Sequence, residues 1–204
     1  MSVIQNKKKP LVVLTGPTAV GKTKLSIALA KAINGEILSA DSMQVYKHMD
    51  IGSAKIRPEE MEGVPHHLID ILEPWEEFNV VVFQKHCLEC MEQIYDRSHI
   101  PILVGGTGFY IQALAYDIDF TENEDHSGIR EELEQLAAER GEEHLHQMLA
   151  QIDPESARAI HANNVKRVIR AIEYYRLTGE KISEHNKRER EKNSPYDLYY
   201  YVLT

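Results

Sequence analysis

Apolar positions in the first half of the chain alternate between short continuous runs and helix-spaced stripes. Residues 11–14 read Leu-Val-Val-Leu, a run typical of a strand buried on both faces, and apolar residues then recur at helical spacing over 22–34. Further runs at 36–40 and 100–104 stand before and after a long helical pattern at 79–97. This alternation predicts a parallel sheet with crossover helices.

Smaller features complete this half. Gly35 is the predicted stop of the first helix, because glycine readily adopts the left-handed conformation that ends helices. After an irregular region, residues 66–71 predict a short strand, and residues 109–115 predict a helix. Cys87 and Cys90 lie on the apolar stripe of the 79–97 pattern, which favours a structural role over redox chemistry or metal binding.

The pattern changes after Tyr116, where charged helical segments replace the β-branched runs. One helix is predicted from Ile129 to a stop at Gly141, and a second around 145–149. Asp153 followed by Pro154 predicts a helix start, and a further helix runs from 164 to Thr178-Gly179.

Residues 197–204 return to strand composition, with three consecutive tyrosines. We therefore predict an α/β chain in which residues 1–116 form a core, 117–194 a mostly helical insertion and 195–204 a return to the core sheet. A domain rarely finishes on a buried strand, so the sequence is expected to be truncated at its C-terminus.

The stretch between the first strand and the first helix carries the spacing of a phosphate-binding loop. Two glycines are separated by four residues and followed by a lysine and a hydroxyl residue. Backbone N–H groups and the helix N-terminus attract anions, Lys22 adds a full positive charge, and the Thr23 hydroxyl can bind Mg²⁺. The core is thus predicted to be P-loop NTPase-like, with a diphosphate or triphosphate held by Gly16, Pro17, Thr18, Ala19, Val20, Gly21, Lys22 and Thr23.

Two more polar segments follow buried strands. Asp-Ser-Met-Gln at 41–44 ends the 36–40 run, and Gly-Gly-Thr-Gly at 105–108 ends the 100–104 run. Ligands of open parallel sheets bind at the carboxyl ends of the strands. We therefore expect Asp41 to lie beside the phosphate-binding loop.

Charge distribution bears on the partners. The formal net charge of −9 argues against a protein coated in basic surface. Residues 163–193, however, contain nine Lys or Arg against five Glu, a balance of +4, which leaves −13 for the remainder. Such concentration favours a site for a polyanion, although a solvated helix of mixed charge would read the same way. No apolar run approaches the roughly 20 residues of a membrane span, and the predicted location is cytoplasmic.

Taken together, these motifs resemble those of the tRNA dimethylallyltransferases, also called tRNA isopentenyltransferases. Ser53 departs from the family's Thr, and the family usually extends well beyond the equivalent of Thr204. The matching segments, in the family's order, are Gly-Pro-Thr-Ala-Val-Gly-Lys-Thr (16–23), Asp-Ser-Met-Gln-Val-Tyr (41–46), Asp-Ile-Gly-Ser-Ala-Lys (50–55), Pro-His-His-Leu-Ile-Asp (65–70), Gly-Gly-Thr-Gly-Phe-Tyr (105–110) and Arg-Val-Ile-Arg-Ala-Ile-Glu (167–173).

The resemblance implies transfer of a dimethylallyl group from dimethylallyl diphosphate to N6 of the adenosine at position 37, beside the tRNA anticodon. It implies Asp41 as general base, Lys22 and a magnesium ion at Thr23 as charge neutralisers, and Thr107 near the reacting atoms. The helical insertion would grip the anticodon arm, and the oligomeric prediction is a monomer. Implied tRNA contacts are Asp41, Ser42, Met43, Gln44, Thr107, Arg130, Lys166, Arg167, Val168, Ile169 and Arg170.

Three other functions share some of these features. An adenylate isopentenyltransferase acting on free AMP, ADP or ATP would need no helical insertion for an anticodon arm. A small-molecule kinase would bind ATP at the same loop and bring arginines to the transferred phosphate. A nucleotide-switched RNA-binding module would keep the loop and the basic segment but would not need Asp41 as a base.

Overall fold

The computed structural model describes residues 8–120 and 128–204. The chain divides into two compact units. The core unit contains residues up to Asp119 together with Asn193–Thr204, and the helical unit spans Phe120–Lys192. The predicted boundaries, at 116/117 and 194/195, lie close to this division.

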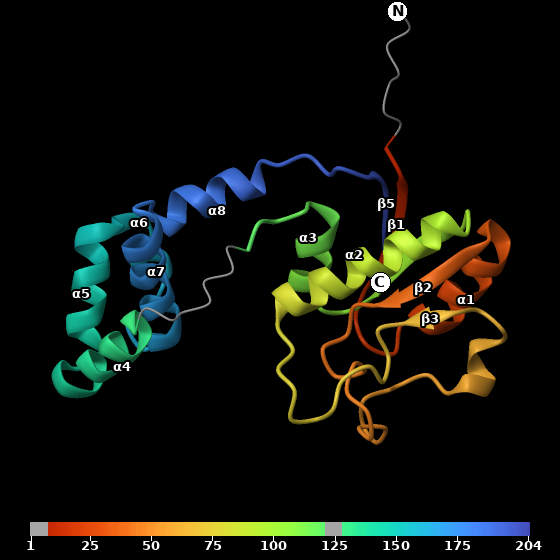
Figure 1. Cartoon of the computed structure of the whole chain (residues 1–204), viewed down its shortest axis with the longest axis horizontal. Helices are drawn as coiled ribbons and strands as arrows, with labels where there is room; N and C mark the ends of the chain where they lie inside the picture. The colour runs from red at the N-terminus through yellow and green to blue at the C-terminus, as the bar shows by residue number, and fades with distance from the viewer. Residues whose placement is uncertain (1–7, 121–127) are drawn as a thin grey trace, which may run out of the picture. The chain divides into compact units, whose positions relative to one another are not determined.

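The core unit is built on a five-stranded parallel sheet with the strand order β3-β2-β4-β1-β5 (Figure 1). Because the chain's last strand pairs with β1, β1 lies between β4 and β5. The P-loop NTPase-like α/β fold predicted from the sequence is confirmed. The strands are β1 (Pro10–Thr15), β2 (Gly35–Ser39), β3 (His66–His67), β4 (Ile100–Gly105) and β5 (Asp197–Val202).

Helices cover this sheet and complete its core. Helix α1 packs on Val12, Ile37 and Ile102. In α2, Cys87 is buried on the same stripe as Phe83, as its position on the apolar pattern predicted. The helical elements of this unit are α1 (Lys22–Ile33), the short η1 (Pro58–Met61), α2 (Val80–Asp96) and α3 (Gly108–Ala115).

Two local predictions for the core unit are wrong. Asn34, and not Gly35, ends α1 in the left-handed conformation, with φ 55°. Gly35 begins β2, where a Cβ atom would lie 2.7 Å from Cδ1 of Ile102, so its small size serves packing. Strand β3 has two residues in place of the predicted six, because Leu68 and Asp70 adopt positive φ angles of 63° and 54°.

The helical unit has its own apolar core. Leu133, Leu145, Leu149 and Ile172 are fully buried in it. Asp153 caps α6 as predicted, since its carboxylate accepts a hydrogen bond from the Ser156 N–H at 3.1 Å. The helices are α4 (Ile129–Arg140), α5 (Glu142–Ile152), α6 (Pro154–Ala159), α7 (Val165–Thr178) and α8 (Ile182–Arg190).

Among the described helices of both units, none has the length and apolar character needed to cross a bilayer.

Candidate active site

The loop between β1 and α1 has the backbone of an anion cradle. Gly16 and Gly21 take φ angles of 146° and 95°, which side chains rarely permit. A Cβ at Gly16 would also lie 2.5 Å from the carbonyl oxygen of Leu203. Gly21 is the N-cap of α1 and no side chain caps that helix, so its first N–H groups are directed to the loop's concave side.

Lys22 lies folded over this loop. Its Nζ donates hydrogen bonds to the carbonyl oxygens of Gly16 and Pro17, at 2.8 and 2.7 Å. The ammonium group is thereby held at the place where the loop would bind a phosphate. The positive charge, the loop N–H groups and the helix N-terminus favour one kind of ligand, a compact polyanion.

A cavity of about 330 Å³ opens beside the loop and joins three segments of the sheet's carboxyl edge. The prediction that Asp41 lies beside the phosphate-binding loop is confirmed. Lining residues from the loop and the start of α1 are Thr18, Ala19, Gly21, Lys22, Thr23 and Ser26; those from the neighbouring strand ends and loops are Ile37, Ser39, Asp41, Gln44, Ala54, Ile56, His66, Ile69, Val104, Gly105 and Gly106.

Asp41 shapes its own turn. Its Oδ1 accepts hydrogen bonds from the backbone N–H groups of Met43, at 2.8 Å, and Gln44, at 3.4 Å. Oδ2 accepts none from the described part of the chain. The half-buried carboxylate is therefore held in orientation by one oxygen while the other remains available in the cavity.

The Gln44 side chain is used inside the core unit. Its Oε1 accepts a hydrogen bond from the Ser39 hydroxyl at 2.9 Å, and its Nε2 donates to the carbonyl oxygens of Ser53 and Ala54 at 3.4 and 3.2 Å. The amide thus ties the end of β2 to the irregular loop that precedes η1.

Three residues predicted to contact tRNA, which are Ser42, Met43 and Thr107, do not line the cavity. Met43 is exposed on the turn, and Ser42 is half-buried beside it. Thr107 is the N-cap of α3, where its carbonyl oxygen accepts hydrogen bonds from the N–H groups of Tyr110 and Ile111. Gly16, Pro17 and Val20 shape the phosphate-binding loop without lining the cavity themselves.

The cavity has an apolar wall that the sequence reading did not assign to the site. Ile37, Ile56, Ile69 and Val104 line it. Ile37 and Val104 belong to β2 and β4, Ile69 follows β3, and Ile56 precedes η1. In the sequence these residues appear only as core positions. The sequence signal that these residues could also line the site was the position of some of them close to strands that end in polar segments.

His66 is a further residue that lines the cavity. Its Nδ1 lies 2.8 Å from the carbonyl oxygen of Val64, which can only accept, so Nδ1 carries a proton. Burial lowers the pKa of His66 below its usual value. The ring therefore enters the cavity wall as a neutral group.

Oxygen ligands for a hard cation are present in the cavity. The Thr23 hydroxyl and the Asp41 carboxylate both line it, and Mg²⁺ prefers such ligands. The described residues form no cluster of three or more His, Cys, Asp or Glu side chains suited to a metal ion. The donor set thus fits a cation that is completed by ligand phosphates and water.

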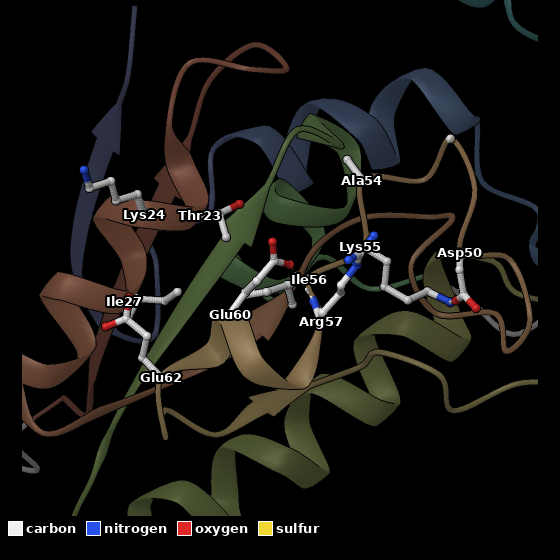
Figure 2. Close-up of a pocket in the computed structure, with 11 residues that line it drawn as sticks. Thr23, Lys24, Ile27, Asp50, Ala54, Lys55, Ile56, Arg57, Glu60 and Glu62 are labelled. Carbon is white, nitrogen blue, oxygen red and sulfur yellow. Dashed lines mark hydrogen bonds and ion pairs between the residues drawn. The ribbon is translucent and has the colours of Figure 1, made fainter.

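A second, more open hollow adjoins the first and has a volume of about 870 Å³ (Figure 2). Thr23, Ala54 and Ile56 line both hollows. The loop around Ala54 is thus a wall shared by the two.

Predicted RNA contacts in the helical unit divide into two groups. Lys166, Arg167 and Arg170 are exposed on α7. Val168 and Ile169 are buried in the unit's apolar core, so their side chains are unavailable to a ligand and the prediction for these two is corrected. Helical periodicity places them on the inner face.

Arg130 makes a two-pronged ion pair inside the helical unit. Its Nε and Nη2 donate to the two carboxylate oxygens of Glu173, at 3.0 and 2.7 Å. The Glu173 side chain is 2% exposed and the Arg130 side chain 48% exposed. Arg130 therefore joins α4 to α7 and presents only part of its guanidinium to solvent.

The parallel sheet and the phosphate-binding loop after β1 define a P-loop NTPase-like protein in which this loop and an apolar wall line one cavity. The chain belongs to the IPP transferase family, whose model matches residues 44–204. A second model, described as isopentenyl transferase, matches residues 9–73.

Individual relatives agree with this membership. The tRNA dimethylallyltransferase of Lachnoclostridium phytofermentans is 64% identical over 195 residues, which are 96% of this chain and 62% of that protein. That of Bacillus velezensis is 57% identical over 187 residues, 92% of this chain and 60% of the relative. The chain thus spans about three fifths of the length of these curated relatives.

Solved structures show the same likeness. A eukaryotic dimethylallyltransferase acting on tRNA matches with a TM-score of 0.84 and 36% identity, over 96% of this chain and 48% of that one. The full-length tRNA isopentenylpyrophosphate transferase of Bacillus halodurans matches with a TM-score of 0.60 and 48% identity, over 94% of this chain and 58% of that one.

Proposed function

We propose that the protein transfers a dimethylallyl group from dimethylallyl diphosphate to N6 of the adenosine at position 37 of tRNA. The observation that carries this proposal is one cavity in which a phosphate-binding loop, the Asp41 carboxylate and an apolar wall meet. A phosphate-binding loop alone suits any nucleotide enzyme. An apolar wall beside it suits a donor whose transferred group is a hydrocarbon.

The donor's diphosphate would bind to the loop N–H groups and to Lys22. As the bond between C1 of the dimethylallyl group and the diphosphate oxygen breaks, its electron pair leaves with the diphosphate, and Lys22 stabilises the developing charge. A Mg²⁺ ion bound at the Thr23 hydroxyl would add positive charge at the same leaving group. The branched hydrocarbon would lie against Ile37, Ile56, Ile69 and Val104.

Asp41 would accept the proton that N6 loses as the new N6–C1 bond forms. An exocyclic amine is a weak nucleophile, and general-base help of this kind contributes about 10²–10⁴-fold. The turn contacts at Oδ1 orient the carboxylate for this task. Thr107, Ser42 and Met43 stay predictions as contacts to the acceptor nucleotide.

The helical unit would bind the anticodon arm through the exposed cations Lys166, Arg167 and Arg170. Phosphate contacts supply most nonspecific RNA affinity, and an extruded base needs its stem to be held. Because the proposed acceptor is tRNA, the proposed compartment is the cytoplasm. The predicted monomeric state stays a prediction.

The test is a transfer assay with the full-length protein. It is incubated with dimethylallyl diphosphate, Mg²⁺ and unmodified tRNA bearing adenosine at position 37. A parallel reaction contains AMP in place of tRNA, and the masses of the products are measured by mass spectrometry. A C5 addition to tRNA alone is expected. Addition to AMP alone would assign the protein to free adenylates, and ATP consumption without any transfer would assign the loop to a kinase.

A further inference from the structure

Lys55 is a buried cation in an otherwise irregular loop of the core unit. Its side chain is 5% exposed. The Nζ donates three hydrogen bonds: to the carbonyl oxygen of Tyr46 at 2.9 Å, to Asp50 Oδ1 at 2.7 Å and to Asp70 Oδ1 at 2.6 Å. All three donors of the ammonium group are therefore satisfied by the protein, which a buried charge requires.

The charge of Lys55 is maintained in this setting. Burial lowers the pKa of Lys55, but the hydrogen bonds and the attraction of Asp50 and Asp70 outweigh burial and raise the pKa above its usual value. The same lysine lowers the pKa of Asp50. The group is therefore a charged cluster at neutral pH.

The cluster fastens a loop to a neighbouring segment. Residues 44–47 pair with residues 70–72 through backbone hydrogen bonds such as Asp70 N–H to Gln44 O at 3.1 Å and Lys47 N–H to Leu72 O at 2.8 Å. Residues 48–54 have no regular secondary structure of their own. The Lys55 ammonium group binds Asp50 inside the loop, Tyr46 in the first paired segment and Asp70 in the second. These bonds hold the loop against the two segments.

This closure bears on the candidate active site. Ala54 and Ile56, the neighbours of Lys55, line the cavity, while the Lys55 side chain extends along the loop toward Asp50 (Figure 2). The Ala54 carbonyl oxygen accepts the hydrogen bond of Gln44 Nε2, and the Gln44 N–H binds Asp41.

The backbone at Ala54 also needs to be held. Its φ angle of 50° lies in the left-handed region, which costs a non-glycine residue on the order of 1 kcal/mol or more. Such a conformation persists only where surrounding contacts impose it. The Lys55 cluster and the Gln44 amide are the contacts on its two sides.

We propose that Lys55 is a positioning residue for the transfer reaction: its bonds to Tyr46, Asp50 and Asp70 hold the 48–56 loop so that Ala54, Gln44 and Asp41 keep their places in the cavity. This inference rests on the proposed function. It assigns Lys55 no contact with substrate.

Replacement of Lys55 by Met removes the charge and keeps the length. With Asp41 free to shift, kcat for transfer to tRNA is expected to fall about 10–100-fold, since a misplacement of about 1 Å has effects of this size. The KM for dimethylallyl diphosphate is expected to change much less than kcat, because the phosphate-binding loop makes none of these bonds and only Ile56 of the apolar wall belongs to the 48–56 loop. Lys55→Arg, which keeps the charge and several donors, is expected to restore part of kcat. A wild-type kcat in Lys55→Met would overturn the inference.

Lys47 offers a matched control in the paired segment that precedes the loop. It pairs with Glu73 at 2.8 Å, but its side chain is 40% exposed and it does not line either hollow. Lys47→Met is expected to leave kcat within about twofold of wild type. An equal loss of kcat in both variants would show a general effect of lost surface charge and contradict the specific role of Lys55.

Hydrogen exchange gives a readout that does not depend on transfer. Lys55→Met is expected to speed amide exchange in residues 44–56 and 70–72 and to leave residues 16–23 unchanged. Should wild type fail to transfer the C5 group, the proposed function fails, but this measurement still decides whether Lys55 holds the loop. Unchanged exchange would overturn the inference.

Asp50→Ala provides a milder variant that removes one acceptor of Lys55. The Asp50 side chain is 72% exposed, and Lys55 keeps Asp70 and the Tyr46 carbonyl oxygen as partners. Faster exchange confined to residues 44–56 in Asp50→Ala is the expected result. If Lys55→Met does not fold, exchange in Asp50→Ala at the wild-type rate would contradict the proposal.

Discussion

The two oxygens of the Asp41 carboxylate have different surroundings. Oδ1 closes a turn by accepting the N–H groups of Met43 and Gln44, and Oδ2 is available in the cavity. The proposed role of Asp41 as a base requires a fixed orientation of the carboxylate, which the hydrogen bonds of the turn supply. Substitutions at this position can therefore separate orientation from proton transfer.

Asp41→Asn is predicted to lower kcat by about 10²–10⁴-fold while dimethylallyl diphosphate binds with wild-type affinity. The asparagine side-chain oxygen can still accept from the Met43 N–H, so the turn is retained without the base. Steady-state kinetics and calorimetric binding of the donor measure the two effects. Asp41→Ala, which also removes the turn contact, is expected to reduce thermal stability as well; if Asn lowered donor affinity as much as kcat, the base assignment would fail.

Glu36 is a buried carboxylate away from the cavity that is bound by one arginine and two histidines. Arg97 donates from Nε and Nη2 at 2.9 and 2.8 Å, and the rings of His67 and His99 lie 2.6 and 2.7 Å away. These bonds, those of Arg97 foremost, lower the pKa of Glu36 from 4.5 to about 2. The group joins β2, β3 and the turn between α2 and β4.

Glu36→Gln is predicted to reduce the free energy of unfolding at pH 7 by roughly 1–3 kcal/mol. The folded-state pKa is depressed, so this stability is fully present above about pH 4.5 and is lost as the pH falls toward 2. Urea unfolding at several pH values should show a shallower acid slope in the variant. Glu62→Gln, which breaks an exposed pair with Lys31, is the control and should change stability far less, because solvent screens exposed pairs. Equal effects in both variants would contradict the role of Glu36.

The carboxyl ends of β2 and β4 approach each other closely at the cavity. A Cβ atom placed on Gly105 would lie 2.3 Å from the carbonyl oxygen of Ala40, and one on Gly106 would have its nearest neighbour at 3.8 Å. Both glycines have φ angles that other residues accept. The pair therefore isolates the effect of close packing from that of backbone conformation.

Gly105→Ala is predicted to destabilise the protein by about 1–3 kcal/mol, because the backbone of β2 has to move. Gly106→Ala should change stability far less. Thermal or chemical denaturation of the two variants side by side makes the comparison. Equal stabilities would show that the strand ends yield without cost and would contradict the close-packing argument.

The proposed function assigns a different task to each of the two units. The phosphate-binding loop, Asp41 and the apolar wall belong to the core unit, and the exposed cations of α7 belong to the helical unit. The helical unit has a separate apolar core, so changes on its surface are expected to leave the cavity of the core unit intact. RNA affinity and donor affinity can thus be altered independently.

Replacing Lys166, Arg167 and Arg170 together by Ala is predicted to weaken tRNA binding and to reduce the slope of log K against log salt by about 0.7–0.9 for each lost phosphate contact. Donor binding should not change. Filter binding across a salt series measures the slope. Replacement of Arg140 and Arg158, exposed on α4 and α6, is the control; a triple variant with the slope of wild type would exclude α7 as the RNA contact.

Patterns among neighbouring residues in the sequence were sufficient to predict much of the fold and part of the candidate site. The conformation of the 16–23 loop could be predicted from the sequence. It depends on the spacing of the loop's own glycines, on the strand before the loop and on the helix after it. The ends of α4 and α7 at Gly141 and Gly179 were predictable for the same reason. Placement of Asp41 beside the loop followed from the shared direction of parallel strands.

Contacts between distant residues were decided only when the chain folded. Four features depend on partners that lie elsewhere in the chain. They are the inward turn of the Gln44 amide, the apolar wall of the cavity, the ion pair of Arg130 with Glu173 and the burial of Lys55. The type of a residue and its neighbours in the sequence indicate which groups its side chain can bind. Which partner it meets is set by packing, because hydrogen bonds and burial act through space and leave no fixed spacing along the sequence.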